Sequence, residues 1–302
     1  MIREVAIPKE LRPAEISQEN AKTQSRLKII FKQLKKNKGA MVGAVLLLLF
    51  ILVSIFADSI APYDPIKMNP AEAMMPPNLN HWFGTDNFGR DILSRVIHGA
   101  RISLWVGVIS VAIGAFFGVV LGLISGYYGR WIDATIMRVT DGMLAFPGLL
   151  LALVIVAVLG PSLFNLMIAV GISSIPRYTR LVRGSVISAK ANLYIEAAHT
   201  VGCQNFRIMF VHLLPNVFAP VIVVSTLGVA GAILIAAGLS FLGIGVRPPT
   251  PEWGAMLSGG RDYLRIAWWI TVFPGLAITV TVLGINMLGD GLRDALDPRL
   301  KT

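Results

Sequence analysis

The chemically reactive side chains of this chain are few and scattered. Its 302 residues include one cysteine, Cys203, and four histidines. No two histidines stand four residues apart, the spacing that would place two metal ligands on one face of a helix. The sequence has no G-x-x-x-x-G-K-[S/T] loop for nucleotide phosphates, no H-E-x-x-H motif and no intact G-x-S-x-G elbow. We therefore expect a protein that is not an enzyme and that binds no metal or cofactor of its own.

One polar segment does carry a pattern. Glu196-Ala197-Ala198 begins it, Gly202 follows, and His212-Leu213-Leu214-Pro215-Asn216 closes it. The alanines favour a helix with little bulk, and the glycine permits a sharp turn at the end of that helix. Glu196 lies near the start of the helix, where a negative charge suits the helix dipole. The residue types alone leave open whether Glu196 contacts a partner or is a solvated cap.

The residues after Gly202 predict a second, apolar helix that includes Phe206. Pro215 is expected to end this helix just before the next apolar run. A stiff pair of short helices between two apolar runs indicates a docking site for a partner protein.

The elements that must position this segment are membrane helices. The chain is 55% hydrophobic and only 15% charged, whereas soluble domains carry about 25% charged residues. A helix needs about 20 apolar residues to cross the hydrocarbon core. We predict an all-α polytopic membrane protein with six transmembrane helices, at about residues 40–58, 102–126, 133–159, 162–178, 217–243 and 266–289.

The basic residues indicate the orientation. With the N-terminus inside, 19 of the 27 lysines and arginines lie on the inner side, seven lie outside and Arg138 lies within a span. This bias places both termini and the docking loop in the cytoplasm, and it explains the net charge without nucleic acid. The predicted parts are a cytoplasmic tail (1–39), the first span (40–58), an extracytoplasmic segment (59–101), a core (102–289) with its cytoplasmic loop (179–216), and a C-terminal tail (290–302).

Apolar and basic residues alternate at helical spacing from Ser25 to Lys38. This pattern is typical of an interfacial helix on the anionic lipid of the inner leaflet, although simple flanking charge before the first span would look similar.

Glycines recur every fourth residue in the second predicted span, at Gly114, Gly118, Gly122 and Gly126. This spacing places them on one helical face, where small residues let a second helix approach closely. The sequence leaves open whether that helix belongs to this chain or to a sister subunit, and whether the register is chance.

The third predicted span contains Asp133, Arg138 and Asp141. Arg138 and Asp141 are three residues apart and are expected to pair on one helical face. A structural ion pair and a role in lining a solute path both remain open for them.

Three further motifs lie in the predicted loops and tail. Gly84-Thr85-Asp86-Asn87-Phe88-Gly89-Arg90-Asp91-Ile92-Leu93-Ser94-Arg95 places Thr85 or Asp86 where either would cap a short helix. Pro248-Pro249-Thr250-Pro251-Glu252-Trp253-Gly254 favours an extended loop. Near the C-terminus, Gly289 is expected to end the last helix and Asp290 to cap a short one after it.

Taken together, these motifs resemble those of ABC importer permeases of the dipeptide/oligopeptide class. The docking segment is similar to the family's E-A-A-x3-G-x9-I-x-L-P loop, with His212 in place of isoleucine, as in the peptide branch. The loop and tail motifs resemble G-T-D-x-x-G-R-D-x-x-S-R, P-P-x-P-E-W-G and G-D-G-L-R-D-x-L-D-P. The residues that the resemblance assigns to ATPase coupling are Glu196, Ala197, Ala198, Gly202, Phe206, His212, Leu214 and Pro215.

The resemblance implies a type I importer fold in a bacterial or archaeal cytoplasmic membrane. It also implies four kinds of partner: a second related permease, two cytoplasmic ATPase subunits that bind ATP and Mg, an extracytoplasmic substrate-binding protein, and lipid. Import of a nickel chelate, glutathione or another small solute on the same scaffold remains an alternative. A stand-alone channel or secondary transporter is a remote one, since no inverted repeat is apparent. The polar residues that could line a path are Asn165, Ser173, Ser174, Ser225 and Ser240.

Overall fold

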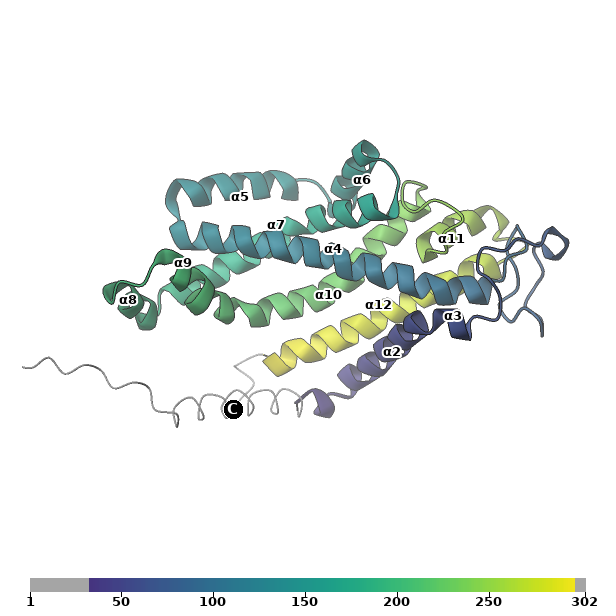
Figure 1. Cartoon of the computed structure of the whole chain (residues 1–302), viewed down its shortest axis with the longest axis horizontal. Coiled ribbons are helices and arrows are strands. Elements are labelled where there is room, and N and C mark those ends of the chain that lie inside the picture. The colour runs from purple at the N-terminus through teal and green to yellow at the C-terminus, as the bar shows by residue number, and fades with distance from the viewer. Residues whose placement is uncertain (1–32, 297–302) are drawn as a thin grey trace, which may run out of the picture.

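Four long helices run side by side along the molecule (Figure 1). The computed structural model describes residues 33–296, so most of the predicted interfacial helix lies outside the described residues. Within this range every regular element is helical, apart from one isolated bridge between Thr85 and Asp91, which confirms the all-α class. The long helices are α4 (Ile92–Tyr128), α7 (Leu163–Lys190), α10 (Leu214–Phe241) and α12 (Trp269–Leu296).

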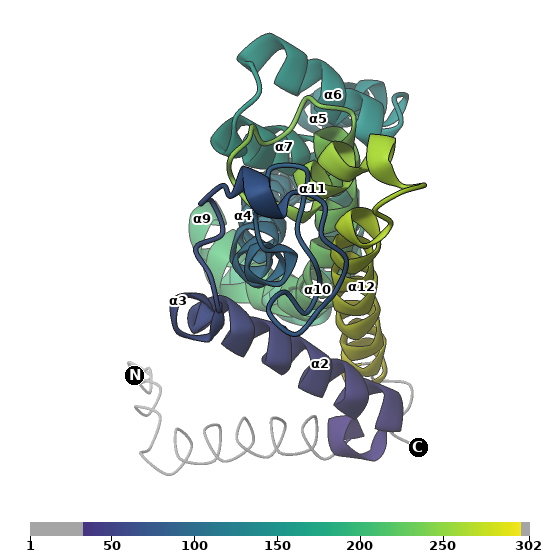
Figure 2. The same cartoon turned by 90° about the vertical axis from the view of Figure 1, so that its right-hand side faces the viewer.

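Shorter helices surround this bundle. Helix α2 (Lys38–Ile55) lies against α12 at one edge, and α5 (Arg130–Leu144) and α6 (Gly148–Leu159) lie at the opposite edge (Figure 2). The remaining helices lie at the two ends of the bundle: α3 (Ala57–Ile60), η1 (Pro70–Glu72), α8 (Leu193–Thr200), α9 (Asn205–Arg207), the π-helical η2 (Ile208–Leu213), α11 (Trp253–Gly260) and η3 (Arg261–Tyr263).

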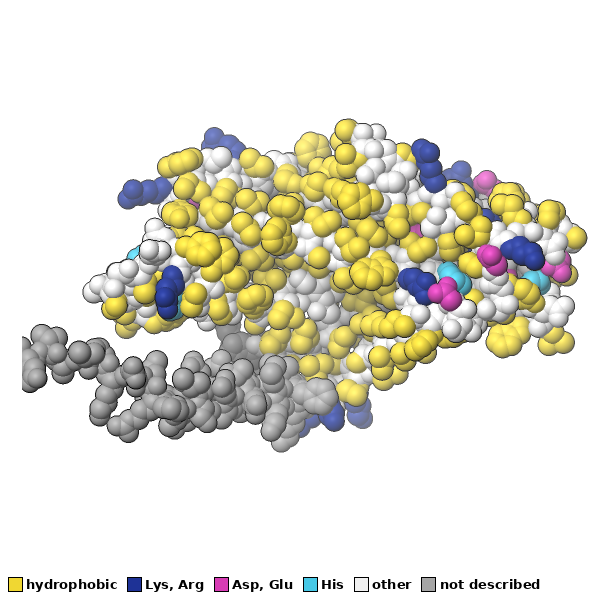
Figure 3. Space-filling model, in the orientation of Figure 1, with side chains coloured by type: hydrophobic (Ala, Val, Ile, Leu, Met, Phe, Trp, Pro, Cys, Tyr) yellow, Lys and Arg dark blue, Asp and Glu magenta, His cyan; other side chains and the backbone are white. Residues whose placement is uncertain are grey.

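Hydrophobic side chains cover the middle of the molecule, and charged side chains gather at its two ends (Figure 3). Many large apolar residues of the helices are exposed, including Leu48 of α2, Phe116 of α4 and Val158 of α6. Such a surface suits contact with lipid or with other membrane helices, because water would not wet it favourably.

The predicted count of six spans is not confirmed by helix length and composition. Among residues 33–296, four helices are long and apolar enough to cross a membrane, or five if α5 and α6 count as one broken span. These two helices meet at an angle of 91°, so the single span predicted at about 133–159 is broken between Leu144 and Gly148. Pro147 explains the break, because the residue before a proline is disfavoured in helical geometry. Helix α7 has 28 residues, but only 14 of them precede Arg177, so it would cross a bilayer of roughly 20 helical residues only with its arginines near one surface.

Two predicted helix ends are also wrong. Helix α4 begins at Ile92, since Asp91 is its cap and accepts a hydrogen bond from Ser94 N at 2.7 Å; neither Thr85 nor Asp86 caps a helix. At the other end of the chain, α12 continues through Gly289 and Asp290 to Leu296. Gly289 has a packing role instead, because a Cβ there would lie 2.5 Å from Leu227 Cδ2 of α10.

The most extensive helix contact joins α4 and α7. The four glycines at 114, 118, 122 and 126 all face α7, where their nearest side chains belong to Ser174, Tyr178, Val182 and Val186. Cβ atoms on Gly122 and Gly126 would lie 2.7 and 2.8 Å from the Cβ atoms of Val182 and Val186. Both helices thus contribute a residue every four positions, and the absence of side chains on α4 lets the two backbones approach.

Candidate functional site

The predicted docking segment forms one end of the molecule (Figure 1). Helix α7 ends at Lys190, α8 follows, and the chain turns at Gly202, whose φ is +83°. No atom lies within 4 Å of the position that a Cβ on Gly202 would take, so the glycine is needed for its backbone geometry and not for packing. The chain then enters α9, η2 and α10 without leaving helical conformation.

The sequence predicted that Pro215 ends the second helix, and this prediction is wrong. Pro215 lies in the first turn of α10, directly after the π-helical segment Ile208–Leu213. A π-turn widens the helix at the point where proline lacks an N–H and its ring needs space, so the helix continues. Residues Asn205–Phe241 therefore form one continuous apolar rod, and the loop is directly joined to α10.

A buried cluster holds the loop against the bundle. Ile195 of α8 and Ile208, Met209 and Leu213 pack with residues at the same end of α4, α7 and α10, and each of the four is at most 6% exposed. Three hydrogen bonds add to this packing. Tyr127 Oη donates to Asn205 Oδ1 at 2.6 Å, Lys190 Nζ donates to the Tyr127 carbonyl at 2.6 Å, and Asn216 Nδ2 donates to Tyr194 Oη at 2.9 Å.

The outer surface of the loop is apolar and uncovered in this chain. Leu193 is 81% exposed, Val201 84% and Phe206 66%. Large apolar side chains on a loop that is held firmly from behind indicate a protein-binding surface.

The predicted coupling residues fall into two groups. Glu196, Ala197, Gly202, Phe206 and Pro215 are exposed. Ala198, His212 and Leu214 are half-buried, and Ala198 and Leu214 pack against the buried cluster. Tyr127 was missed from the sequence because it lies far along the chain, at the end of α4; its position one residue after Gly126 was the available signal.

The predicted pair of Arg138 with Asp141 is wrong. Asp141 accepts a hydrogen bond from Arg180 of α7 at 2.6 Å. Asp133 accepts from both Nε and Nη2 of Arg183, at 2.5 and 2.6 Å. Pairing between helices replaces pairing within α5, and it fastens α5 to the half of α7 that leads into the loop.

Two cavities share Arg177 of α7 in their walls. One lies mainly between α7 and α10, and the other mainly between α10 and α12. The first, about 160 Å³, is lined among others by Ser173, Ser174 and Tyr178. The second, about 590 Å³, lies nearer the loop and is lined by Asn216 and Arg293 as well. The hydroxyls of Ser173 and Ser174 donate to the carbonyls of Val170 and Gly171 in their own helix.

Two other predicted path residues, Asn165 and Ser240, stabilise turns, whereas Ser225 lies within α10. Asn165 Nδ2 donates to the carbonyls of Leu159 and Gly160, which holds the turn between α6 and α7. Ser240 Oγ accepts from Val246 N at 3.4 Å, beyond the end of α10.

The opposite end of the molecule contains the G-T-D motif. Gly84 and Gly89 have φ values of +74° and +73°, which glycine adopts without steric cost. The Asp91 carboxylate accepts a hydrogen bond from His81 Nδ1 at 2.9 Å. It also accepts the bond from Ser94 N that caps the start of α4. Trp269 Nε1 donates to the Thr85 carbonyl at 3.1 Å, so the motif is also tied to α12.

Comparison with known families agrees with this architecture. Residues 118–302 match the family described as binding-protein-dependent transport system inner membrane component, and residues 25–77 match the N-terminal TM domain of oligopeptide transport permease C. The chain belongs to the binding-protein-dependent transport system inner membrane components, and it is a multi-pass inner-membrane permease of the ABC transporter class.

Particular relatives are close over most of the chain. The dipeptide transport system permease protein DppC of Alkalihalophilus pseudofirmus is 53% identical over 90% of both chains. The di/tripeptide transport system permease protein DppC of Pseudomonas aeruginosa is 48% identical, over 92% of this chain and 93% of the relative. The glutathione transport system permease protein GsiD of Escherichia coli O157:H7 is 48% identical over 90% of both chains. A chain of the MetNI methionine ABC transporter, in an inward-facing conformation, shares the fold at a TM-score of 0.52 and 16% identity, over 68% of this chain and 98% of the other.

Proposed function

We propose that this chain is the permease subunit of an ATP-driven importer of dipeptides. It forms half of the translocation pathway, and a second related permease forms the other half. Two cytoplasmic ATPase subunits hold ATP and Mg, and a binding protein delivers the peptide from outside. The observation that carries the proposal is the apolar, exposed loop of α8 and α9, held rigidly at one end of the bundle.

The loop is placed to transmit a displacement to the helices on both sides of it. It joins α7 directly to α10, and α7 is itself packed on α4 through the glycine face and bonded to α5 through Asp133 and Asp141. Closure of an ATPase dimer around nucleotide would therefore move α4, α5, α7 and α10 together. Rigid-body motion of packed helices is an established way to alternate access between two sides of a membrane.

We further propose six crossings with both termini in the cytoplasm. The broken pair α5 and α6 makes one of them, and α7 makes another, with its arginines near the inner surface. The excess of basic residues at the termini and the loop supports this orientation.

Glutathione is the second candidate substrate, because the glutathione permease relative is as similar as the di/tripeptide one. Glutathione is peptide-like, so the same scaffold would accommodate it with few changes.

The test is purification of the tagged chain from its own membrane in mild detergent, followed by mass spectrometry and transport assays. We expect two P-loop ATPases and a second permease to co-purify. In vesicles with the binding protein, ATP should drive uptake of labelled dipeptide more strongly than uptake of glutathione. A chain that purifies alone and still moves solute without ATP would contradict the proposal.

A further inference from the structure

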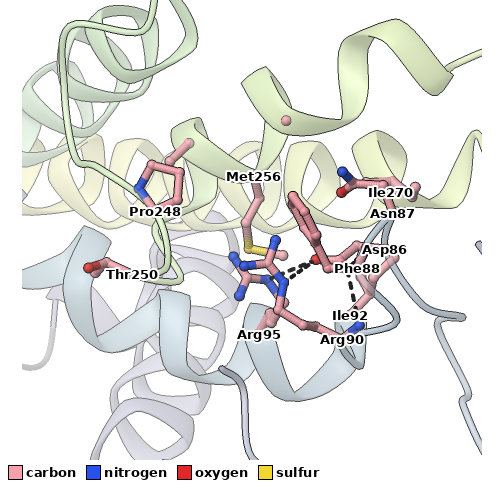
Figure 4. Close-up of a pocket in the computed structure, with 12 residues that line it drawn as sticks. Asp86, Asn87, Phe88, Arg90, Ile92, Arg95, Pro248, Thr250, Met256 and Ile270 are labelled. Atoms are coloured by element: carbon pink, nitrogen blue, oxygen red, sulfur yellow. Dashed lines mark hydrogen bonds and ion pairs between the residues drawn. The ribbon is translucent and has the colours of Figure 1, made fainter. Parts of the chain in front are cut away.

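The end of the molecule opposite the α8 loop contains a small charged pocket (Figure 4). It has a volume of about 90 Å³, and it lies between the start of α4, the chain before α11, α11 itself and α12. Its walls include Asp86, Phe88, Arg90, Arg95, Thr250 and Met256. Four of these belong to the G-T-D-x-x-G-R-D-x-x-S-R motif, to which the proposed transport mechanism assigns no role.

Two arginines in this pocket share one carboxylate. Arg90 Nε donates to Asp86 Oδ2 at 2.6 Å, and Arg95 Nε lies 3.7 Å from the same oxygen. Both side chains are deeply buried, with Arg90 6% and Arg95 5% exposed. Two cations and one anion leave a net charge of +1 among the residues that line the pocket. A buried charge of this kind is costly unless a counter-charge completes it.

The two arginines differ in how they are held. Arg95 Nη1 donates to the carbonyls of Pro65 and Pro249, at 2.8 and 3.3 Å. Arg90 lies with its guanidinium carbon 4.7 Å from the centre of the Phe88 ring. Within residues 33–296, no protein group accepts a hydrogen bond from its two terminal nitrogens, and Figure 4 shows both guanidinium groups under Met256 beside the Phe88 ring. Arg90 thus keeps a two-pronged donor available for a carboxylate.

The size of the pocket limits its occupant. A cavity of about 150 Å³ accommodates one benzene molecule, so about 90 Å³ holds a carboxylate on a short stem. Pockets for whole small molecules are several times larger, at about 300–1,000 Å³. The occupant is therefore one group of a larger molecule and not an entire dipeptide.

The surroundings indicate a protein. Phe88 lines the pocket and is 45% exposed. In the same segment, Trp82 is 69% exposed and Leu79 is 93% exposed. Phe88 thus forms an exposed apolar part of the pocket wall, and the chain segment that leads to the pocket carries further exposed apolar side chains. Such side chains near a buried charged pocket are typical of protein interfaces, in which apolar contacts exclude water from a central anchor.

We propose that the Arg90–Arg95 pocket binds the carboxylate of an acidic side chain on the protein that docks at this end of the permease. Asp86 holds the two guanidinium groups in place, and the incoming carboxylate supplies the missing negative charge. The proposal rests on the proposed function, in which that protein is the substrate-binding protein.

The test measures docking of the purified binding protein to the whole transporter in lipid nanodiscs. Arg90→Gln removes the free donors, whereas Arg261→Gln is the matched control, since Arg261 lies at the same end, is exposed and pairs only with its neighbour Asp262 within the described residues. We expect the dissociation constant to rise at least about tenfold for R90Q, as for loss of one partner of a buried charge pair, and to change less than about twofold for R261Q.

A second measurement uses the wild-type complex, so it does not depend on folding of the variant. Carboxyl groups of the binding protein are labelled with a carbodiimide and glycinamide, with and without the transporter. One Asp or Glu should be protected on docking, and its amide variant should weaken docking without adding to the effect of R90Q.

Three results would overturn the proposal. The first is equal docking by R90Q and R261Q, which would leave Arg90 a structural role only. The second is unchanged docking with a raised peptide concentration for half-maximal uptake, which would assign the carboxylate to the peptide. The third is that no carboxyl group is protected. Wild-type vesicles that take up no dipeptide would instead count against the proposed function, so the two failures are distinguishable.

Discussion

Gly122 of α4 lies directly against Val182 of α7, where a Cβ on the glycine would stand 2.7 Å from the Cβ of Val182. Since Val182 is fully buried, its side chain has no room to move aside. The close approach of α4 and α7 at this position thus depends on the absence of a side chain at Gly122.

Gly122→Ala should therefore destabilise the protein by about 1–3 kcal/mol, the usual cost of overpacking. Gly142→Ala is the control, because Gly142 is exposed within α5 and has no atom within 4 Å of its Cβ position. This control should be neutral or stabilising by up to about 1 kcal/mol, because alanine is the better helix former. Thermal unfolding of the purified proteins in one detergent measures both; equal midpoints would contradict the packing argument.

Gly202→Ala should reduce peptide-stimulated ATPase activity. Alanine at a positive φ costs about 1–2 kcal/mol, and at Gly202 that strain alters the turn that presents the apolar face of α8 and α9. Gly160, directly after the last residue of α6, offers a matched control outside the loop. Its φ is +87°, and likewise no atom lies within 4 Å of its Cβ position. Gly160→Ala should carry at least the same strain and leave the stimulation nearly unchanged. Equal loss in both variants would mean that strain alone, and not the loop surface, is responsible.

Asp133 and Arg183 should behave as a coupled pair. Their side chains are 19% and 34% exposed and form two hydrogen bonds between α5 and α7. Asp133→Asn and Arg183→Gln should each lower stability, and the double variant should lose about 1 kcal/mol less than the sum. Arg138→Gln should have little effect, because Arg138 forms no ion pair or hydrogen bond within the described residues. Thermal unfolding of the wild type, the two single variants and the double variant measures this double-mutant cycle. Strictly additive effects would show that Asp133 and Arg183 do not stabilise each other.

Glu252 should make stability depend on pH. It caps α11 through bonds from Gly254 N and Ala255 N, lies outside the four candidate spans and is only 2% exposed. Burial raises the pKa of its carboxyl group above the ordinary value, against the opposing effect of the two backbone N–H groups. Between the unfolded pKa, about 4.3, and the raised folded pKa, the folded state binds more protons. Stability should therefore be highest below the unfolded pKa and fall as pH rises through that window.

Glu252→Gln should remove this part of the pH dependence, since the amide does not titrate. Unfolding midpoints of both proteins from about pH 4 to pH 7 test the expectation. If the unfolding midpoint of the wild type rose with pH relative to that of the variant, the pKa of Glu252 would be lowered by folding and not raised.

The helical class, the membrane location and the order of the functional segments were predictable from the sequence. Long uncharged runs have no stable alternative to helices in lipid, because every backbone polar group must be satisfied within the segment. The position of the turn at Gly202 was predictable for a similar reason, since glycine adopts a positive φ at no steric cost.

Helix ends and charge partners were not predictable, because they depend on groups distant along the chain. Pro215 marks a helix end by local rules, yet a π-turn absorbs it and α10 continues. Arg138 and Asp141 have the spacing of a pair, yet Arg180 is 39 residues away along the chain and closer in space.

The sequence by itself determined that this chain is a helical membrane protein with a short helical loop between two apolar runs, since composition and local geometry suffice for both. Its motifs added the resemblance to importer permeases. Only the tertiary structure decided which helix faces and which charged residues lie against one another. It placed the glycines of α4 against α7, joined Asp133 to Arg183, and brought Arg90 and Arg95 to one carboxylate. Each of these depends on the relative position of two elements, which packing of complementary surfaces fixes and which a one-dimensional pattern does not contain.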